Sequence, residues 1–286
     1  FIDKHSPYAT KMGKTVETLE EALAAVDWYA EQGYLQIKLY SSINPEWVKP
    51  IAERTRKLGM RLSGHIPAFM TAEEAVKAGF NEIQHLNMVF LNFLGKNIDT
   101  RKKLRFTIPG TQSGTLDLNS DEVNQFIALL KSKNTAVDPT VALIRYGFLA
   151  NAGQLNETVA DIADHVPPTV KRYFSTGMLK IEPQERTAYR SSAQAMLKMV
   201  KRLHDSGVQI IPGTDFIAGL TLHSELINYA LAGISNAEVL KLATIDSAKL
   251  MGVDKQTGSI DVGKNAELVI IDGNPLNDIA EIRKVA

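Results

Sequence analysis

Two histidines follow short apolar runs within one stretch of the chain, GHIPAFMTAEEAVKAGFNEIQHLN, which spans residues 64–87. His65 stands in SGHIP and His85 in IQHLN, while Lys38 stands in QIKLY and Asp215 in PGTDF. Imidazole and carboxylate groups together suit zinc, iron, manganese or nickel. A lysine can instead act as a Schiff-base nucleophile. Each residue taken singly also has a purely structural explanation. A histidine at a strand end can be a hydrogen-bonded packing residue, Lys38 can extend its charged end to solvent, and Gly-Thr-Asp can form a helix cap and turn.

The elements that position these residues alternate between strand-like and helical segments. Five short apolar runs are expected to be strands: 35–40, 60–66, 81–86, 135–140 and 208–214. Helical spacing of apolar residues predicts helices over 17–33, 44–59, 71–79, 120–134 and 183–207, with three short helices between 224 and 252. This alternation is typical of βαβ units in a parallel sheet. In βα barrels the active site lies at the carboxyl ends of the strands. A barrel would therefore bring the four candidate residues together at the same end.

Helix boundaries are marked by local capping signals. Asn44 is the expected N-cap of the second helix, with Pro45 at its first position. Thr71 and Glu74 have the spacing of a capping box. The segments 88–119 and 144–181 lack this regularity, and we expect the first to be irregular and the second partly helical. The opening FIDKHSPYAT has no strand or helix signal and is expected to be a loop in the interior of a longer chain.

Composition excludes several classes of function. Lysine plus arginine (32) balances aspartate plus glutamate (32), so the basic excess typical of nucleic-acid binders is absent. The chain has no cysteine, which excludes disulfides and thiolate catalysis. No apolar run reaches the roughly 18 residues that cross a bilayer. We therefore expect neither nucleic acid nor a membrane as partner. A homo-oligomer is compatible with the sequence, and no segment indicates a compartment. The expectation of a small-molecule or dipeptide-like substrate comes from the family resemblance described next.

These motifs resemble the amidohydrolase superfamily of metal-dependent hydrolases, in its imidazolonepropionase-like and Xaa-Pro dipeptidase-like branch. IKLY, SGHIP, IQHLN and PGTDF match strands four, five, six and eight of that family. The segment LHSELINYALAGISNAEVLKLATIDSAKLMGVDKQTGSIDVGKNAELVIIDGNPL resembles its C-terminal signature, with Glu267 where an aspartate is usual. The resemblance covers about residues 17–282. It implies a (β/α)8 TIM-type barrel, of which strands 4–8 are present within 1–254, and C-terminal strands of a small β-sandwich within 255–286.

The resemblance also implies roles for individual residues. Lys38 would be carboxylated and bridge two divalent metals, while His65 and His85 would bind the more exposed ion. Asp215 would bind the buried metal and act as general base. Zinc is the leading candidate, with one or two ions, and the substrate would carry an amide or peptide-like C–N bond, as a dipeptide does. Tyr40 and His223 are candidate substrate-binding residues at the site rim, where a packing role for Tyr40 stays open.

One family feature is absent from the sequence. The first strand of the family carries a His-x-His pair for the buried metal, whereas no two of the six histidines here are separated by one residue. We therefore expect the 286 residues by themselves to be incompletely assembled. Two alternatives remain open: a Schiff-base lyase or aldolase-type barrel with Lys38 as nucleophile, and a non-catalytic fragment that binds one metal or a partner chain.

Overall fold

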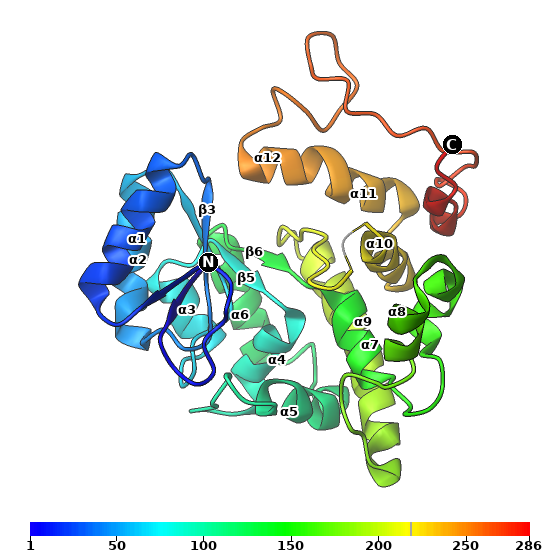
Figure 1. Ribbon diagram of the computed structural model, residues 1–286, viewed down its shortest axis with the longest axis horizontal. Coiled ribbons are helices and arrows are strands. Elements are labelled where there is room, and N and C mark those ends of the chain that lie inside the picture. The colour runs from blue at the N-terminus through cyan, green and yellow to red at the C-terminus, as the bar shows by residue number, and fades with distance from the viewer. Residues whose placement is uncertain (218) are drawn as a thin grey trace. The chain divides into compact units, whose positions relative to one another are not determined.

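A computed structural model describes residues 1–217 and 219–286 (Figure 1). The chain divides into two compact units. Unit 1 comprises residues 1–138 and 206–209, and unit 2 comprises residues 139–205 and 210–286. Lys38, His65 and His85 belong to unit 1, whereas Asp215 and His223 belong to unit 2.

Unit 1 is built on a parallel sheet. Six strands are described, in the order β2-β1-β3-β4-β5-β6, and every neighbouring pair is parallel. They are β1 (Ile2–Lys4), β2 (Lys14–Val16), β3 (Gln36–Leu39), β4 (Arg61–Gly64), β5 (Glu82–Gln84) and β6 (Ala136–Asp138). The expected α/β class with a parallel sheet is therefore present, and the arrangement is consistent with the barrel of the amidohydrolases.

Helices connect the strands of unit 1. They are α1 (Leu19–Glu31), α2 (Pro45–Lys57), α3 (Ala72–Ala78), α4 (Leu86–Leu94), α5 (Leu104–Gln112), the 3-10 turn η1 (Ser113–Thr115) and α6 (Asp121–Ser132). Figure 1 shows α1 and α2 side by side. Asn44 caps α2 by accepting a hydrogen bond from the Glu46 N–H, and Thr71 and Glu74 form the capping box of α3. Both predicted caps are confirmed.

The core of unit 1 lies between the sheet and these helices. The central strands contribute buried aliphatic side chains, Ile37 and Leu39 from β3 and Leu62 from β4. Val48 and Ile51 of α2 are likewise fully buried. Because successive strand residues point to opposite faces, burying Ile37 and Leu39 against helices turns Lys38 to the other face of the sheet.

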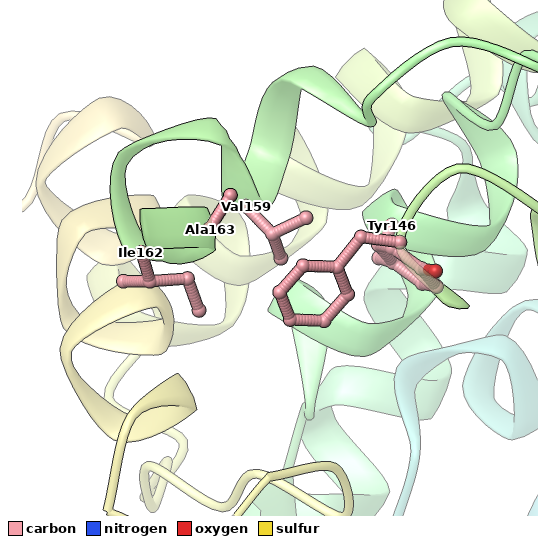
Figure 2. Close-up of a cluster of buried hydrophobic side chains, with 5 residues drawn as sticks. Tyr146, Val159, Ile162 and Ala163 are labelled. Carbon is pink, nitrogen blue, oxygen red and sulfur yellow. The ribbon is translucent and has the colours of Figure 1, made fainter. Parts of the chain in front are cut away.

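Unit 2 is mostly helical over its described residues. It contains α7 (Val141–Phe148), η2 (Glu157–His165), α8 (Pro168–Tyr173), η3 (Pro183–Glu185), α9 (Arg186–Asp205), α10 (Thr221–Leu231), α11 (Asn236–Lys241), the π-helix η4 (Leu242–Asp246), α12 (Ser247–Met251) and η5 (Ile279–Arg283). A cluster of buried side chains, Tyr146, Val159, Ile162, Ala163 and Phe174, joins α7, η2 and the end of α8 (Figure 2).

Several expectations about local structure are wrong. Ile2–Lys4 forms a strand although residues 1–10 were expected to be a loop. The segment 88–119 contains α5 and most of α4 rather than irregular chain. The expected strand 208–214 does not join the sheet as a strand; Gln209 O accepts a hydrogen bond of 2.9 Å from Val137 N, and Pro212 has no N–H to continue a ladder.

The tail differs from its strand-like sequence. Its described residues contain an isolated antiparallel bridge between Ile271 and Val285 and no hairpin strand. Val262, Val269 and Ile270 are largely exposed. The composite β-sandwich over 255–286 therefore stays a prediction, as does the boundary at residue 254.

Candidate metal site

His65 is placed by a glycine that holds β4 close to β3. Gly64 has φ +134°, a conformation that L side chains rarely adopt, and it pairs with Leu39. A Cβ at Gly64 would lie 2.2 Å from the Leu39 carbonyl oxygen. The same oxygen accepts a hydrogen bond of 3.0 Å from the His65 N–H. The glycine therefore allows the strand end to bring His65 directly against β3.

His85 leaves its strand through an unusual backbone turn. It has φ 74° and ψ 117°, immediately after β5 and before α4. Its N–H donates to the Asp138 carbonyl at 2.8 Å, which ties it to the end of β6. Positive φ is uncommon for a residue other than glycine, and such strain gathers at functional sites. This turn places the His85 side chain beside that of His65.

The two imidazoles converge through the same ring atom. His65 Nε2 and His85 Nε2 lie 2.9 Å apart, and the ring centroids are 4.6 Å apart. Both side chains are buried. Burial lowers the pKa of His65 well below its usual range, and the charges of His85, Arg105 and Lys38 lower it further. Burial also lowers the pKa of His85, with Lys38 and Arg105 adding to the effect. Both shifts favour the neutral form of the ring.

Lys38 and Tyr40 extend this site along β3. Lys38 lies opposite Ser63 in the sheet, one position before the Leu39–Gly64 pair. Its Nζ is 5.2 Å from the Tyr40 ring centroid, and the Tyr40 ring lies 4.4 Å from that of His65. Lys38, Tyr40, His65 and His85 thus form a continuous group in unit 1, supplied by β3, β4 and β5 and the residues that follow them.

The donor set suits a divalent cation. Two imidazole nitrogens on one tetrahedral zinc ion lie about 3.3 Å apart, for Zn–N bonds of about 2.0–2.1 Å. The two Nε2 atoms lie 2.9 Å apart, so the rings would need to separate only slightly to bind one ion together. Metal binding requires neutral imidazole, and the lowered pKa values of His65 and His85 favour that form. Two histidines alone are a weak site, because over residues 1–217 and 219–286 no group of three or more His, Asp or Glu side chains is arranged for a metal.

Asp215 and His223 lie in unit 2. Asp215 has φ 44°, in the left-handed region. His223 is in the first turn of α10, and burial lowers its pKa. Their relation to the unit 1 residues stays a prediction.

Two residues beside the site were missed by sequence reasoning. Ser41 Oγ lies 3.2 Å from His65 Nδ1, and Arg105 Nη1 lies 3.5 Å from the same nitrogen. Ser41 directly follows the strand-like run that contains Lys38, a position that could have marked it. Arg105 lies in the segment expected to be irregular, and the sequence around it gives no signal.

Comparison with known proteins gives consistent matches. The profile of the amidohydrolase family matches residues 14–285. A 5-methylthioadenosine/S-adenosylhomocysteine deaminase of Thermoanaerobacter pseudethanolicus is 28% identical over 54% of this chain and 42% of its own length. An N-substituted formamide deformylase of Arthrobacter pascens is 25% identical over 48% of this chain and 27% of its own. The chain thus matches less than half the length of these relatives.

Solved structures share the fold. A Xaa-Pro dipeptidase with bound methionine matches with a TM-score of 0.60 and 20% identity, over 95% of this chain and 57% of that chain. An ochratoxinase of A. niger matches with the same TM-score and identity, over 95% of this chain and 53% of its own. No helix of the described residues is long and apolar enough to cross a membrane. With nearly its whole length matched by the family profile, the chain belongs to the amidohydrolase family.

Proposed function

We propose that this chain carries part of the metal site of an enzyme that hydrolyses a C–N bond in an amide or peptide-like substrate. The observation that carries the proposal is the convergence of two buried imidazoles through their Nε2 atoms at the ends of adjacent parallel strands. Family membership supports it, since the names of the relatives describe deamination, deformylation and dipeptide cleavage.

His65 and His85 would hold the cation together with Lys38. An ammonium group repels a cation, so Lys38 would first react as the free amine. Its Nζ forms a bond to the carbon of CO₂ and loses a proton, which yields a carbamate with two oxygen ligands. The change also replaces a positive charge beside both histidines with a negative one, which favours cation binding.

The remaining roles concern proton transfer and substrate. A bound divalent metal lowers the pKa of a water molecule and polarises the carbonyl group of the substrate. Asp215 would take the proton of that water and deliver it to the leaving amine. Tyr40 presents its ring beside His65 and would contact the substrate. His223 is the second candidate for substrate binding. We propose zinc as the metal and a dipeptide or N-acyl amino acid as the substrate.

The test measures amine release by the full gene product loaded with zinc and supplied with bicarbonate. The substrate panel contains Xaa-Pro and other dipeptides, N-acyl amino acids and N-substituted formamides. We expect release that requires metal and falls to background in the double variant His65→Ala, His85→Ala. Release that persists in the double variant, or its absence across the panel from metal-loaded protein, contradicts the proposal. Activity of the 286-residue chain by itself would show that a His-x-His strand is not essential.

A further inference from the structure

A cavity of about 340 Å³ lies within unit 2, lined by residues of α7, η2, α10 and η5. Its walls combine aliphatic and basic side chains: Leu149, Ile227 and Leu231 on one hand, Arg145 and Arg283 on the other. Pockets that bind small molecules usually measure about 300–1,000 Å³, so the cavity has room for a small ligand. None of the residues proposed for the metal site lines it.

Arg145 brings a positive charge to this cavity, and the side chain that it contacts is neutral. Arg145 Nη1 donates to Asn228 Oδ1, while Asn228 Nδ2 donates to the Ser224 carbonyl at 2.7 Å. Burial lowers the pKa of Arg145, and the charge of Glu157 offsets part of that shift. Among the residues that the structure describes, the buried Arg145 Nε–H has no hydrogen-bond partner. A buried cation is costly unless an anion meets it, so a negatively charged ligand here would be stabilising.

The other charged side chains of the cavity form ion pairs with one another. Arg283 Nη1 pairs with Asp161 Oδ2. Glu157 Oε1 lies 3.3 Å from Nη1 of Arg190, which belongs to α9. Both carboxylates are thus used by other arginines, and Arg145 leaves this group of side chains with an excess of one positive charge.

We propose that this cavity binds a small organic carboxylate with an apolar body, held by Arg145. A carboxylate accepts two parallel hydrogen bonds from one edge of a guanidinium. Because Asn228 uses Nη1 of Arg145, the edge formed by Nε and Nη2 is the one that remains for the ligand. The Arg283 Nε–H is likewise buried without a partner among the described residues and is a second donor in this lining. The hydrocarbon part of the ligand would contact Leu149 and Ile227.

The carboxylates in the lining argue against a more highly charged anion. Glu157 and Asp161 both line the cavity, and they would repel a phosphate group, which carries about 1.5–2 negative charges at pH 7. Phosphate also has no apolar part to bury against Leu149 and Ile227. A single negative charge, by contrast, matches the one excess positive charge. Inorganic phosphate therefore serves as the control for unspecific anion binding.

The experiment titrates the full gene product with isocaproate, a branched aliphatic carboxylate, in the absence of any substrate. The comparison ligands are its neutral amide, acetate and inorganic phosphate. Binding is followed by NMR of the arginine Nε–H groups in protein labelled with ¹⁵N-arginine. We expect isocaproate to shift the Arg145 signal and to bind roughly 10–100-fold more tightly than its amide, because hydrogen bonds to a charged group are lost in the amide. Acetate and phosphate should bind more weakly than isocaproate.

Two arginine variants separate the cavity from the rest of the surface. Arg145→Gln removes the charge and keeps a polar side chain beside Asn228, and it should weaken isocaproate binding by roughly 10–100-fold. Arg54→Gln is the matched control, because Arg54 donates to Asp27 in unit 1 and should not affect this affinity. The double variant His65→Ala, His85→Ala should bind isocaproate like the wild type, which distinguishes this cavity from the proposed metal site.

Several outcomes would overturn the proposal. In the wild type these are an Arg145 signal that isocaproate does not shift, equal affinity for isocaproate and its amide, and acetate or phosphate binding as tightly as isocaproate. These comparisons need no variant, so they decide the matter even if Arg145→Gln does not fold. Unchanged affinity in a folded Arg145→Gln, or loss of binding in the histidine double variant, contradicts it equally. Each of these results leaves the test of C–N bond hydrolysis unaffected, because no turnover is measured.

Discussion

His65 Nε2 and His85 Nε2 lie 2.9 Å apart although 20 residues and helix α3 separate the two histidines in sequence. The contact arises because β4 and β5 are parallel neighbours, with Gly64 opposite Ile83. Parallel pairing puts both carboxyl ends at the same edge of the sheet. A pair of buried imidazoles at this edge has the chemistry of a metal site, from which the first prediction follows.

Removing both imidazoles should abolish metal binding by unit 1. We expect protein prepared without chelator to contain bound divalent metal, measured by mass spectrometry of the element, and the double variant His65→Ala, His85→Ala to contain only background metal. His204→Ala is the control, since His204 lies in the last turn of α9 and contacts Asp205. Equal metal content in the wild type and the double variant would remove both residues from the site.

Lys38 should be carboxylated when metal is present. With ¹³C-labelled bicarbonate, we expect a carbamate signal in the carbon NMR spectrum that disappears in Lys38→Arg, because the guanidinium stays charged and does not add CO₂. Lys14→Arg is the control, since Lys14 Nζ lies 3.9 Å from the Trp28 ring centroid. A carbamate that persists in Lys38→Arg excludes this residue. Borohydride trapping of a carbonyl compound on Lys38 would instead support the Schiff-base alternative.

Local sequence signals predicted the helices whose ends are set by caps. α2 and α3 begin where Asn44 and Thr71 accept backbone hydrogen bonds, an interaction within a few residues. α5 could not be predicted in this way, because Pro109 and Gly110 lie inside it and are usually helix breakers. β1 depends on distant pairing, such as the hydrogen bond of 3.1 Å from Tyr40 N to Ile2 O.

The candidate site was predictable to the level of strand ends. Lys38, His65 and His85 could be placed at one sheet edge because parallel order follows from alternating strands and helices. The groups around Nδ1 of His65 could not be predicted from the sequence. The position of Arg105 depends on α5, and the contact of Ser41 with His65 depends on the direction of a side chain. Asp215 follows an apolar run that does not form a ladder strand, so its place at the site remains a prediction.

Asp215→Asn should lower turnover of the full gene product on whichever substrate it hydrolyses. An amide keeps the shape of the carboxylate but cannot act as a general base at neutral pH. General acid–base help is typically worth about 10²–10⁴-fold, and a fall in kcat of at least this order is expected. Metal content is measured in the same samples, because the family role of Asp215 includes metal binding. Near-normal turnover at normal metal content would rule the role out.

Gly64→Ala should destabilise the chain and weaken metal binding together. The added Cβ would lie 2.2 Å from Leu39 O and 2.7 Å from Leu39 N, so β4 must move away from β3 and carry His65 with it. We expect a loss of about 3 kcal/mol in the free energy of unfolding, from backbone strain and overpacking. Urea unfolding and zinc competition provide the two measurements.

Gly33→Ala separates the two contributions to that loss. Gly33 also has a positive φ, +79°, but a Cβ there meets nothing within 4 Å. The left-handed backbone conformation alone costs a non-glycine residue about 1–2 kcal/mol, and zinc affinity should not change. Equal effects of both substitutions would show that the approach of β4 to β3 does not depend on Gly64.

Glu225 should make the stability of unit 2 depend on pH. It is fully buried in α10, and its two carboxyl oxygens accept hydrogen bonds from Val141 N at 2.9 Å and Ala142 N at 2.7 Å, at the start of α7. Burial raises the pKa of this carboxyl from 4.5 to about 7, and the hydrogen bonds from Ala142 and Val141 offset part of that rise. Between these two values the folded chain binds more protons than the unfolded chain.

Stability from this group is therefore fully present below about pH 4.5 and is lost as the pH rises toward 7. The loss is roughly 3 kcal/mol across that window. Glu225→Gln should remove this dependence, because the amide does not ionise while its oxygen can still cap α7. We expect the difference in unfolding free energy between variant and wild type, from urea titrations at pH 5 and pH 7.5, to shift in favour of the variant at the higher pH.

Glu31→Gln, at the exposed end of α1, is the control and should keep a constant difference from the wild type at the two pH values. A Glu225→Gln variant whose difference from the wild type is the same at both pH values would show that folding does not raise the pKa of the Glu225 carboxyl.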